Sequence, residues 1–588
     1  MFLATTAYQR FWNKDKPILF LGEWCRIYSQ KHVWSKLEHQ VLPYYAFKRE
    51  VLFDGYKYSL NVYERLLVEL SQALNKSHQT NHSVRYWRIV LGPWLLAFIQ
   101  VFLDRYRSIC IAAESGKVTN TWISAEFLDD LIPPDFPEFR RCFVGEDQYN
   151  HYLCSQIIRS VEKIPWEEKK DIDFSLLGLE ANQTSLKKQL KRSIFRLIEM
   201  WPRFVPDSLQ TIFLIDSYFK PIDLIRLQLS AGMMPVLYRS REKVSFIKAN
   251  SQMRRDINLD PRENQFESIL TKYLPFHIPK VYLEGYSEMA RRAEKVFPKK
   301  IKVIFTSGAH QAFDCFKFWA GNQVEQGAKL AISQHGGNVG DALWSTNDDH
   351  EQKISDRYFS WGWGSSNDNK LVRMPSSMLA RIKGKVRPNP KGTILCVTCT
   401  FPRYSYTMLS APTSSAVLKL LKFQEQFFRV VSPGVHELLI LRLFMLDRGW
   451  EEKLRWHDSD VSPKIYQGTK SFYSHLSENR LCICFYNGTP LLETFVANYP
   501  TLLCWDPNYV ELNKTAQPYF NILREAGILH DTPETLASET QRIYGDPMSW
   551  WMSRKVQEAR KKFCDQFART SKQWCVEWKR EMLELAKD

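Results

Sequence analysis

The chain has 588 residues, of which 44% are hydrophobic and 24% are charged, and its formal net charge at pH 7 is +16. This composition is that of a globular protein and excludes extended disorder, and the length allows two to four domains. The positive charge predicts an anionic partner. The sequence carries no zinc-finger spacing, no RRM-like aromatic motif and no helix-turn-helix signature, so we do not expect nucleic acid as that partner.

The cysteines and the apolar segments indicate neither a metal site nor a membrane span. The twelve Cys show no metal-ligand spacing, so we expect buried reduced thiols, no bound metal and no cofactor. The N-terminus lacks the basic segment and apolar core of a signal peptide. The longest apolar run, 89–103, contains Gly92 and Pro93 and is too short to span a bilayer. We expect a cytoplasmic protein, soluble or peripheral on the inner face of the cytoplasmic membrane.

Residues 1–205 predict a mainly helical region. Apolar residues recur at three- and four-residue steps through 59–74, which is typical of an amphipathic helix. The segment 85–104 predicts a helix pair or a kinked buried helix, because Pro93 must interrupt the hydrogen bonding.

From about residue 208 the pattern changes to alternating strands and helices. Strands are predicted at 211–215, 235–238, 302–305, 329–332 and 358–361, and after a Pro- and Gly-containing linker at 393–400, 437–444, 481–485 and 501–505. We assign 206–388 to a first Rossmann-like domain on the acceptor side. Residues 389–588 form the predicted second domain, which holds the nucleotide sugar and carries closing C-terminal helices.

The segment 481–505 predicts a parallel βαβ unit, with Asn487, Gly488 and Thr489 at the turn. Open parallel sheets bind ligands at this edge, and the helix start offers free N–H groups to an anion. Glu493, one turn into the helix, is placed to reach a sugar or ribose hydroxyl. We predict a nucleotide-sugar site here. The alternative is an ordinary βαβ turn in which Thr489 caps a helix.

A His and an Asp follow a predicted strand of the first domain. His310 and Asp314 are four residues apart, so on a helix they share a face, and a His paired with a carboxylate can act as a general acid or base. We predict that His310 is catalytic with Asp314 as its partner. Asp314 as the nucleophile of a retaining reaction stays open. The other alternative is that this segment is only a capped helix start with a structural ion pair.

A second polar turn, 333–337, follows the next strand. We predict that His335 stabilises the leaving phosphate, since the two glycines after it let backbone N–H groups approach an anion. A flexible loop is the alternative. The charged segment 348–357 predicts a polar cleft loop. Further donor-binding residues are predicted from their places at strand ends: Ser307, Gln334, Gly336, Gly337 and Arg442.

Two α/β regions joined by a linker predict the α/β class with a GT-B-like architecture. In that architecture two Rossmann-like domains face a cleft that holds the active site. Here a mainly helical N-terminal region precedes them.

With these segments in place, the chain resembles a bacterial family of O-antigen or surface-carbohydrate transferases. The similarity runs nearly end to end and includes LFLGEWC, NHSVRYWRIVLGPW, TSGAHQAFD, SQHGG, ISDRYFSWGWG and NGTPLLETFVANYPTLLCWDP. That family is similar to GT-B enzymes of the sialyltransferase-like kind, which move Kdo or related ulosonic acids from CMP-activated donors. The resemblance implies donor phosphate and base at 335–337 and 487–493. This chain departs from the pattern at Asn338-Val339 and at Gly488, which bears on the phosphate contacts.

The expected function is therefore glycosyl transfer in lipopolysaccharide, O-antigen or capsule assembly. The expected donor is CMP-Kdo or a related CMP-ulosonic acid, and the acceptor is a glycan or lipid-linked oligosaccharide. A UDP- or GDP-sugar transferase or a CDP-polyol-phosphate transferase on the same fold is the alternative. A non-catalytic scaffold that binds nucleotide sugar or glycan is a second alternative. The net charge adds an anionic membrane surface to the expected partners.

Overall fold

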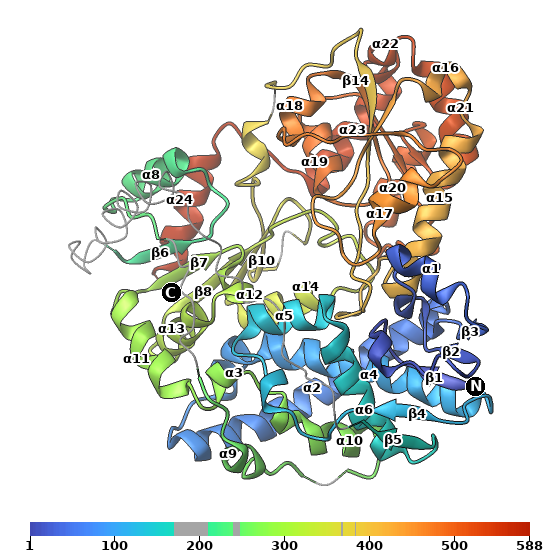
Figure 1. Ribbon diagram of the computed structural model, residues 1–588. Coiled ribbons are helices and arrows are strands. Elements are labelled where there is room, and N and C mark those ends of the chain that lie inside the picture. Colours follow the sequence, from blue (N-terminus) through green and yellow to red (C-terminus); the bar gives the residue numbers. More distant parts are fainter. Residues whose placement is uncertain (170–209, 239–246, 261, 366–367, 383, 588) are drawn as a thin grey trace, which may run out of the picture.

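The computed structural model describes residues 1–169, 210–238, 247–260, 262–365, 368–382 and 384–587 (Figure 1). Two parallel β-sheets, each with its own helices, lie in separate parts of the molecule, and a helical region built from the N-terminal residues lies beside both (Figure 1). The expected α/β class with two Rossmann-like units is confirmed.

The first unit has a five-stranded parallel sheet in the order β10-β9-β8-β7-β6. Its strands are β6 (Ile212–Ile215), β7 (Val303–Thr306), β8 (Lys329–Ser333), β9 (Arg357–Ser360) and β10 (Leu371–Arg373). Their short apolar runs are buried, as expected for a sheet covered on both faces. The strand predicted at 235–238 is wrong, because that segment makes only an isolated bridge between Ile215 and Tyr238.

The second unit has a six-stranded parallel sheet in the order β13-β12-β11-β14-β15-β16. Its strands are β11 (Thr393–Val397), β12 (Leu439–Arg442), β13 (Lys464–Ile465), β14 (Asn479–Cys484), β15 (Thr501–Cys504) and β16 (Leu529–His530). The predicted βαβ unit is confirmed as β14, α19 (Thr489–Val496) and β15. The strand order reverses between β11 and β14, which makes that edge the expected ligand position.

The N-terminal region is helical, as predicted, but it also contains small sheets. Its long helices are α2 (Arg49–His78), α3 (Val84–Val90), α4 (Gly92–Glu114), α5 (Phe136–Gly145) and α6 (Asp147–Val161). A parallel sheet of three-residue strands, β1 (Phe2–Ala4), β2 (Ile18–Phe20) and β3 (His39–Val41), was not predicted, because such short runs carry no periodicity. The predicted domain boundary at residue 205 falls outside the described residues.

Helices α3 and α4 form the predicted helix pair. They are bent by 70° relative to each other, and Pro93 lies in the first turn of α4. No single helix of the described residues is long and apolar enough to cross a membrane, although this bent pair meets the length and composition criteria jointly. Most residues of α4 are buried in the protein core.

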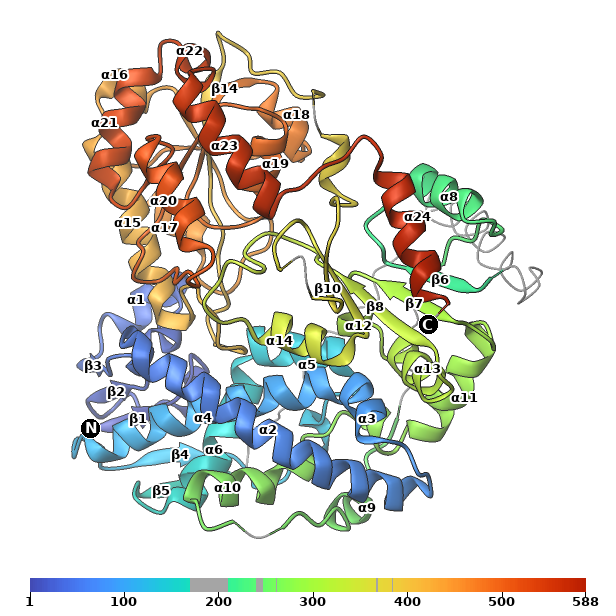
Figure 2. The same cartoon turned by 180° about the vertical axis from the view of Figure 1, so that it is seen from behind.

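The C-terminal helices divide between the two units. Helix α23 (Arg554–Phe567) packs on α19 of the second unit, whereas α24 (Trp574–Leu585) returns to α8 (Pro221–Ser230) of the first (Figure 2). There the buried Trp578 ring contacts Phe305 and Phe359, with centroid distances of 5.3 and 5.0 Å. The second domain predicted at 389–588 is therefore corrected, since its last helix completes the first unit.

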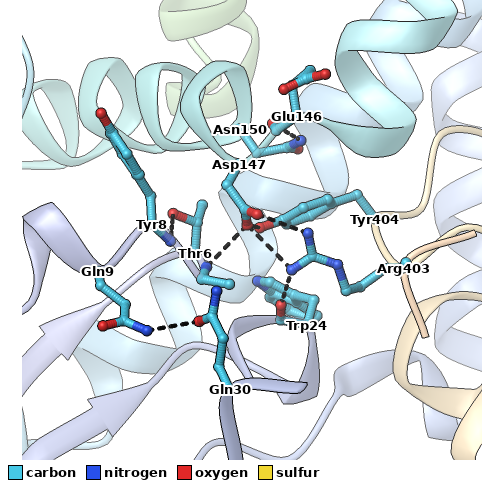
Figure 3. Close-up of polar contacts among 12 residues, drawn as sticks. Thr6, Tyr8, Gln9, Trp24, Gln30, Glu146, Asp147, Asn150, Arg403 and Tyr404 are labelled. Atoms are coloured by element: carbon cyan, nitrogen blue, oxygen red, sulfur yellow. Dashed lines mark hydrogen bonds and ion pairs between the residues drawn. The ribbon is translucent and has the colours of Figure 1, made fainter. Parts of the chain in front are cut away.

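An ion pair between the buried Arg403 and the partly buried Asp147 anchors the second unit to the N-terminal region (Figure 3). The Arg403 guanidinium donates to Asp147 Oδ2 at 2.8 Å and also to the Trp24 carbonyl oxygen. Asp147 also accepts from the Ala7 N–H at 3.0 Å and from the Tyr404 hydroxyl. Because a buried charge is tolerated only when it is paired and hydrogen-bonded, this network holds the second unit against the helical region.

Candidate functional site

The largest cavity of the site lies in the second unit and has a volume of about 700 Å³. It is formed at the carboxyl ends of β11 and β12, by the loops that follow them and by the first residues of α19. Thr398, Arg442, Tyr466, Phe472, Thr489 and Glu493 contribute to its wall. A cavity at this edge of a parallel sheet, with a helix N-terminus in its wall, suits an anionic ligand.

The wall of this cavity contains six charged residues: Arg442, Asp447, Glu452, Lys453, Lys470 and Glu493. The Arg442 guanidinium donates to the Lys470 carbonyl at 3.0 Å and lies over the Tyr466 ring, and it pairs with no carboxylate among the described residues. Glu493 accepts from the Tyr473 hydroxyl at 2.5 Å, and burial raises its pKa. Burial, with the Asp447 carboxylate nearby, raises the pKa of Glu452 to about 7. The cavity wall therefore holds an arginine without a carboxylate partner among the described residues and two carboxyl groups with raised pKa values.

In the first unit, one buried carboxylate holds two histidines. Glu351 Oε1 lies 3.1 Å from His310 Nε2 and 3.0 Å from His335 Nε2. The Gln311 amide donates to the same oxygen at 2.5 Å, and the Tyr358 hydroxyl donates to Oε2 at 3.3 Å. Helix α14 (Thr346–Ile354) carries Glu351, so the acidic segment predicted to be a loop is a helix with buried polar residues. That prediction is corrected.

The electrostatics of this cluster make His335 a cation at neutral pH. Burial disfavours its charge, but the Glu351 carboxylate outweighs burial and raises the pKa of His335 to about 9. Burial likewise opposes the charge on Glu351, and the two histidines nevertheless hold its pKa far below the usual range. His335 keeps 24% of its side chain exposed, whereas His310 is fully buried. Of these two histidines, His335 is the one that can present positive charge to a ligand.

The two units meet where the His335 turn touches the start of α19. The Gly337 N–H donates to Thr489 Oγ1 at 3.0 Å. A Cβ atom on Gly337 would lie 2.4 Å from the Gly488 carbonyl carbon, so only glycine allows this approach. Asn487 donates to Asp341 Oδ2 at 2.9 Å across the same junction. The turn that carries His335 therefore contacts the helix N-terminus that forms part of the cavity wall.

A family model for LIC12162 family transferases matches residues 1–582 of the chain. The chain belongs to this family. The expectation of an enzyme that catalyses group transfer is confirmed at that level.

Several solved structures resemble this transferase loosely. MurG of Acinetobacter baumannii is 12% identical over 51% of this chain and 78% of its own, with a TM-score of 0.30. TarM is 13% identical over 51% and 58%, with a TM-score of 0.31. A protein named as a UDP-N-acetylglucosamine 2-epimerase, from Listeria monocytogenes, is 9% identical over 77% and 93%, with a TM-score of 0.32. No curated protein matches the sequence. With scores this low, no residue role is transferred from these proteins.

The predicted pairing of His310 with Asp314 is wrong. Phe313 has an extended backbone (φ −117°, ψ 96°) and separates α12 (Ala309–Ala312) from α13 (Asp314–Glu325), so the two side chains share no helix face. Asp314 instead binds Lys317 Nζ at 2.5 Å and accepts from the Tyr282 hydroxyl at 2.5 Å. The partner of His310 in the transferase is Glu351. Asp314 belongs to a buried structural cluster, so a nucleophilic role for it has no support in the geometry.

The predicted donor-binding residues separate into two groups. Arg442, Thr489 and Glu493 line the cavity. The others hold the junction or its supports: the Gln334 amide is bonded to Trp361, Trp363 and Gly336, and Ser307 is fully buried. The members of this second group are Ser307, Gln334, Gly336, Gly337, Asn487 and Gly488. Direct donor contact through their side chains is not supported.

Three residues of the site were missed by the sequence reasoning. Glu351 was one of several acidic residues in a segment without an evident pattern. Recognising 346–354 as a helix would have indicated that Glu351 and His350 are buried. Glu452 follows a loop, where no periodicity applies. Asp216 directly follows β6, so its place at a strand end was the available signal. It adopts a positive φ of 47°, and its carboxylate lies against Gly308.

We predict that Glu351→Gln lowers the pKa of His335 from about 9, because burial is then opposed only by the smaller effects of Asp348 and Asp216. In the unsubstituted protein the charge on His335 stabilises the fold fully below about pH 6.5, and this contribution is lost as pH rises through about 9. Histidine-resolved NMR titration, with His335→Asn for assignment, measures the midpoint. Glu558→Gln, in an exposed ion pair of α23, is the control. An unchanged midpoint in Glu351→Gln would contradict the coupling.

Proposed function

We propose that this transferase is a glycosyltransferase that takes a sugar from a nucleotide donor held in the 700 Å³ cavity of the second unit. The observation that carries the proposal is the cavity at the N-terminus of α19, together with the contact that the turn carrying the His335 cation makes with that same helix start through Gly337. A sugar nucleotide has its scissile bond at a phosphate, and both a helix N-terminus and an imidazolium stabilise phosphate charge.

The cavity wall suits the rest of such a donor. The Glu493 carboxyl is positioned one turn into α19, where it can accept a hydrogen bond from a ribose hydroxyl. Tyr466 and Phe472 offer ring faces on which a base can stack. The unpaired Arg442 guanidinium can bind a second anionic group of the donor, a phosphate or a sugar carboxylate.

We assign the reaction as follows. The acceptor hydroxyl gives its proton to the Asp216 carboxylate, and its oxygen forms a bond to the anomeric carbon of the donor sugar. The bond from that carbon to the donor phosphate oxygen breaks, and the phosphate leaves with the electron pair. His335 and the α19 N–H groups stabilise the leaving charge. A two-step reaction with retained configuration stays open.

The preferred donor is CMP-Kdo or a related CMP-ulosonic acid, and the preferred role is O-antigen, capsule or lipopolysaccharide assembly at the cytoplasmic face. The end-to-end motif resemblance supports this choice. The alternatives are a UDP- or GDP-sugar and, on the same scaffold, a CDP-polyol phosphate. Family membership among transferases favours each of these over a non-catalytic scaffold.

A thermal-shift comparison of CMP, CDP, UDP and GDP tests the donor assignment. We expect one nucleotide to stabilise the protein, with Thr489→Ala and Glu493→Ala each raising its dissociation constant about 10- to 100-fold, equivalent to about 1–3 kcal/mol per lost contact. Thr535→Ala and Glu558→Ala, at exposed positions away from the cavity, are the matched controls. Unchanged nucleotide affinity in both cavity variants would contradict the assignment of the donor to this cavity.

The assignment of Asp216 has its own test. The Asp216 carboxylate is close enough to His310 and His335 for both to act against the rise in pKa that partial burial causes. We expect Asp216→Asn to lower turnover about 10²- to 10⁴-fold, while nucleotide affinity stays the same. Turnover is measured as release of nucleotide from the donor that the thermal shifts identify, with Asp15→Asn as control. Near-normal turnover would return Asp216 to a structural role.

The net charge of +16 supports contact with an anionic membrane surface that carries a lipid-linked acceptor. We expect flotation with phosphatidylglycerol vesicles at low salt and its loss at high salt, since exposed charges are screened beyond about 10 Å at 0.1 M. Neutral phosphatidylcholine vesicles are the control. An absence of flotation at low salt would contradict membrane binding.

A further inference from the structure

A small pocket lies between the N-terminal helices and the first unit, next to the histidine cluster. Helices α4 and α5 form one side, and α14 with residues 406–407 forms the other; α5 and α14 lie side by side in the centre of the molecule (Figure 1). Its volume is about 40 Å³. One water needs about 10–15 Å³ on this measure, so the pocket has room for roughly three waters. That space fits a carboxylate or phosphate group and excludes a whole sugar ring.

The buried imidazole of His350 lines this pocket. Its side chain is 6% exposed, and neither ring nitrogen has a hydrogen-bond partner in the described part of the chain. Burial, with the nearby His310, lowers the pKa of His350 to about 3, so the ring is neutral and offers one donor and one acceptor. The ring is packed over Gly92, where a Cβ atom would lie 2.6 Å from Cε1. A buried polar ring without partners is costly, and a ligand in the pocket would satisfy it.

A second polar group of the pocket is the Arg140 guanidinium. It lies over the Tyr406 ring, 5.6 Å from the centroid, and its Nη2 approaches the Tyr406 hydroxyl at 3.4 Å. No carboxylate of the described residues forms an ion pair with Arg140. An arginine held by an aromatic ring and lacking a counterion is suited to bidentate binding of a carboxylate or phosphate.

The pocket connects directly to the reacting groups. Gln311 contributes to its wall, and the same side chain donates to Glu351, which holds His335. A ligand group bound between Arg140 and His350 is therefore separated from the catalytic cluster by one side chain. Besides residues 406–407, the pocket is lined by the first unit and the N-terminal region, and it shares no lining residue with the donor cavity.

We propose that this pocket is an acceptor subsite that binds the anionic group of a charged acceptor sugar, through Arg140 as the ion-pairing group and His350 as the hydrogen-bonding group. The inference rests on the proposed function and specifies its acceptor as an acidic or phosphorylated sugar. The donor cavity has its own cation, so the two sites are distinguishable by substitution.

Isothermal titration with glucuronate, inorganic phosphate and glucose, each with the nucleotide that gives the largest thermal shift present at saturation, tests the subsite. We expect at least one of the two anions to bind, with glucose at least tenfold weaker. Arg140→Gln should weaken that anion at least tenfold and leave nucleotide affinity unchanged. Arg429→Gln, which removes an exposed arginine paired with Asp460, should have no effect. The tighter of the two anions identifies the group as a carboxylate or a phosphate.

A second, pocket-filling variant keeps the test decisive if the Arg140→Gln variant does not fold. Ala97 on α4 lines the pocket and is 4% exposed, so Ala97→Leu should block the anion without changing any charge. Equal binding of both anions to wild type, Arg140→Gln and Ala97→Leu would overturn the subsite, as would binding of glucose as tight as that of the anions. If no nucleotide binds, the donor proposal fails. Titration of the same anions without nucleotide then still measures binding to the small pocket.

Discussion

The buried carboxylate of Glu351 is the constraint on which the candidate site depends. Removing a carboxylate from water costs several kcal/mol unless its oxygens are paired and hydrogen-bonded. Here the partners come from three other segments: α12, the turn after β8, and β9. Satisfying one buried charge therefore fixes four segments of the first unit together. It also places the one partly exposed histidine of the cluster at the junction with the second unit.

A close backbone approach sets the geometry between the two units. The turn after β8 and the start of α19 come so near that a side chain at Gly337 would collide with the Gly488 carbonyl. The contact is short and polar, and the network around Asp147 and Arg403 (Figure 3) is a second polar contact that holds the second unit, here against the N-terminal region. Because both restraints are directional hydrogen bonds, the donor cavity and His335 keep a defined relation. Electrostatic stabilisation of a leaving group needs that kind of preorganisation.

The positions and partners of a few charged residues matter more for the site than the total net charge of the chain. The net charge of +16 is spread over the whole chain, yet the cations that matter are a few residues with unusual partners. His335 is charged because of a buried carboxylate, and Arg442 and Arg140 lack carboxylate partners among the described residues. Three such cations lie in the cavity of the second unit, at the junction and in the small pocket, as the proposed reaction between an anionic donor and an anionic acceptor requires.

The sequence by itself determined the two parallel sheets, most of their strands and the βαβ unit at 481–505, because buried strands and amphipathic helices leave local apolar patterns. It also located the polar turns at strand ends and so predicted His335, Thr489, Glu493 and Arg442 as site residues. The tertiary structure alone decided which partner each polar residue has. His310 pairs with Glu351, forty-one residues away, because a break at Phe313 turns Asp314 toward Lys317. Likewise, residues 337 and 489 meet, and α24 joins the first unit, only after the chain has folded back over more than a hundred residues. The spacing of residues along the chain predicts which of them share a face of a helix or strand. Pairing between residues far apart in the sequence is set by packing and by the need to satisfy buried charge.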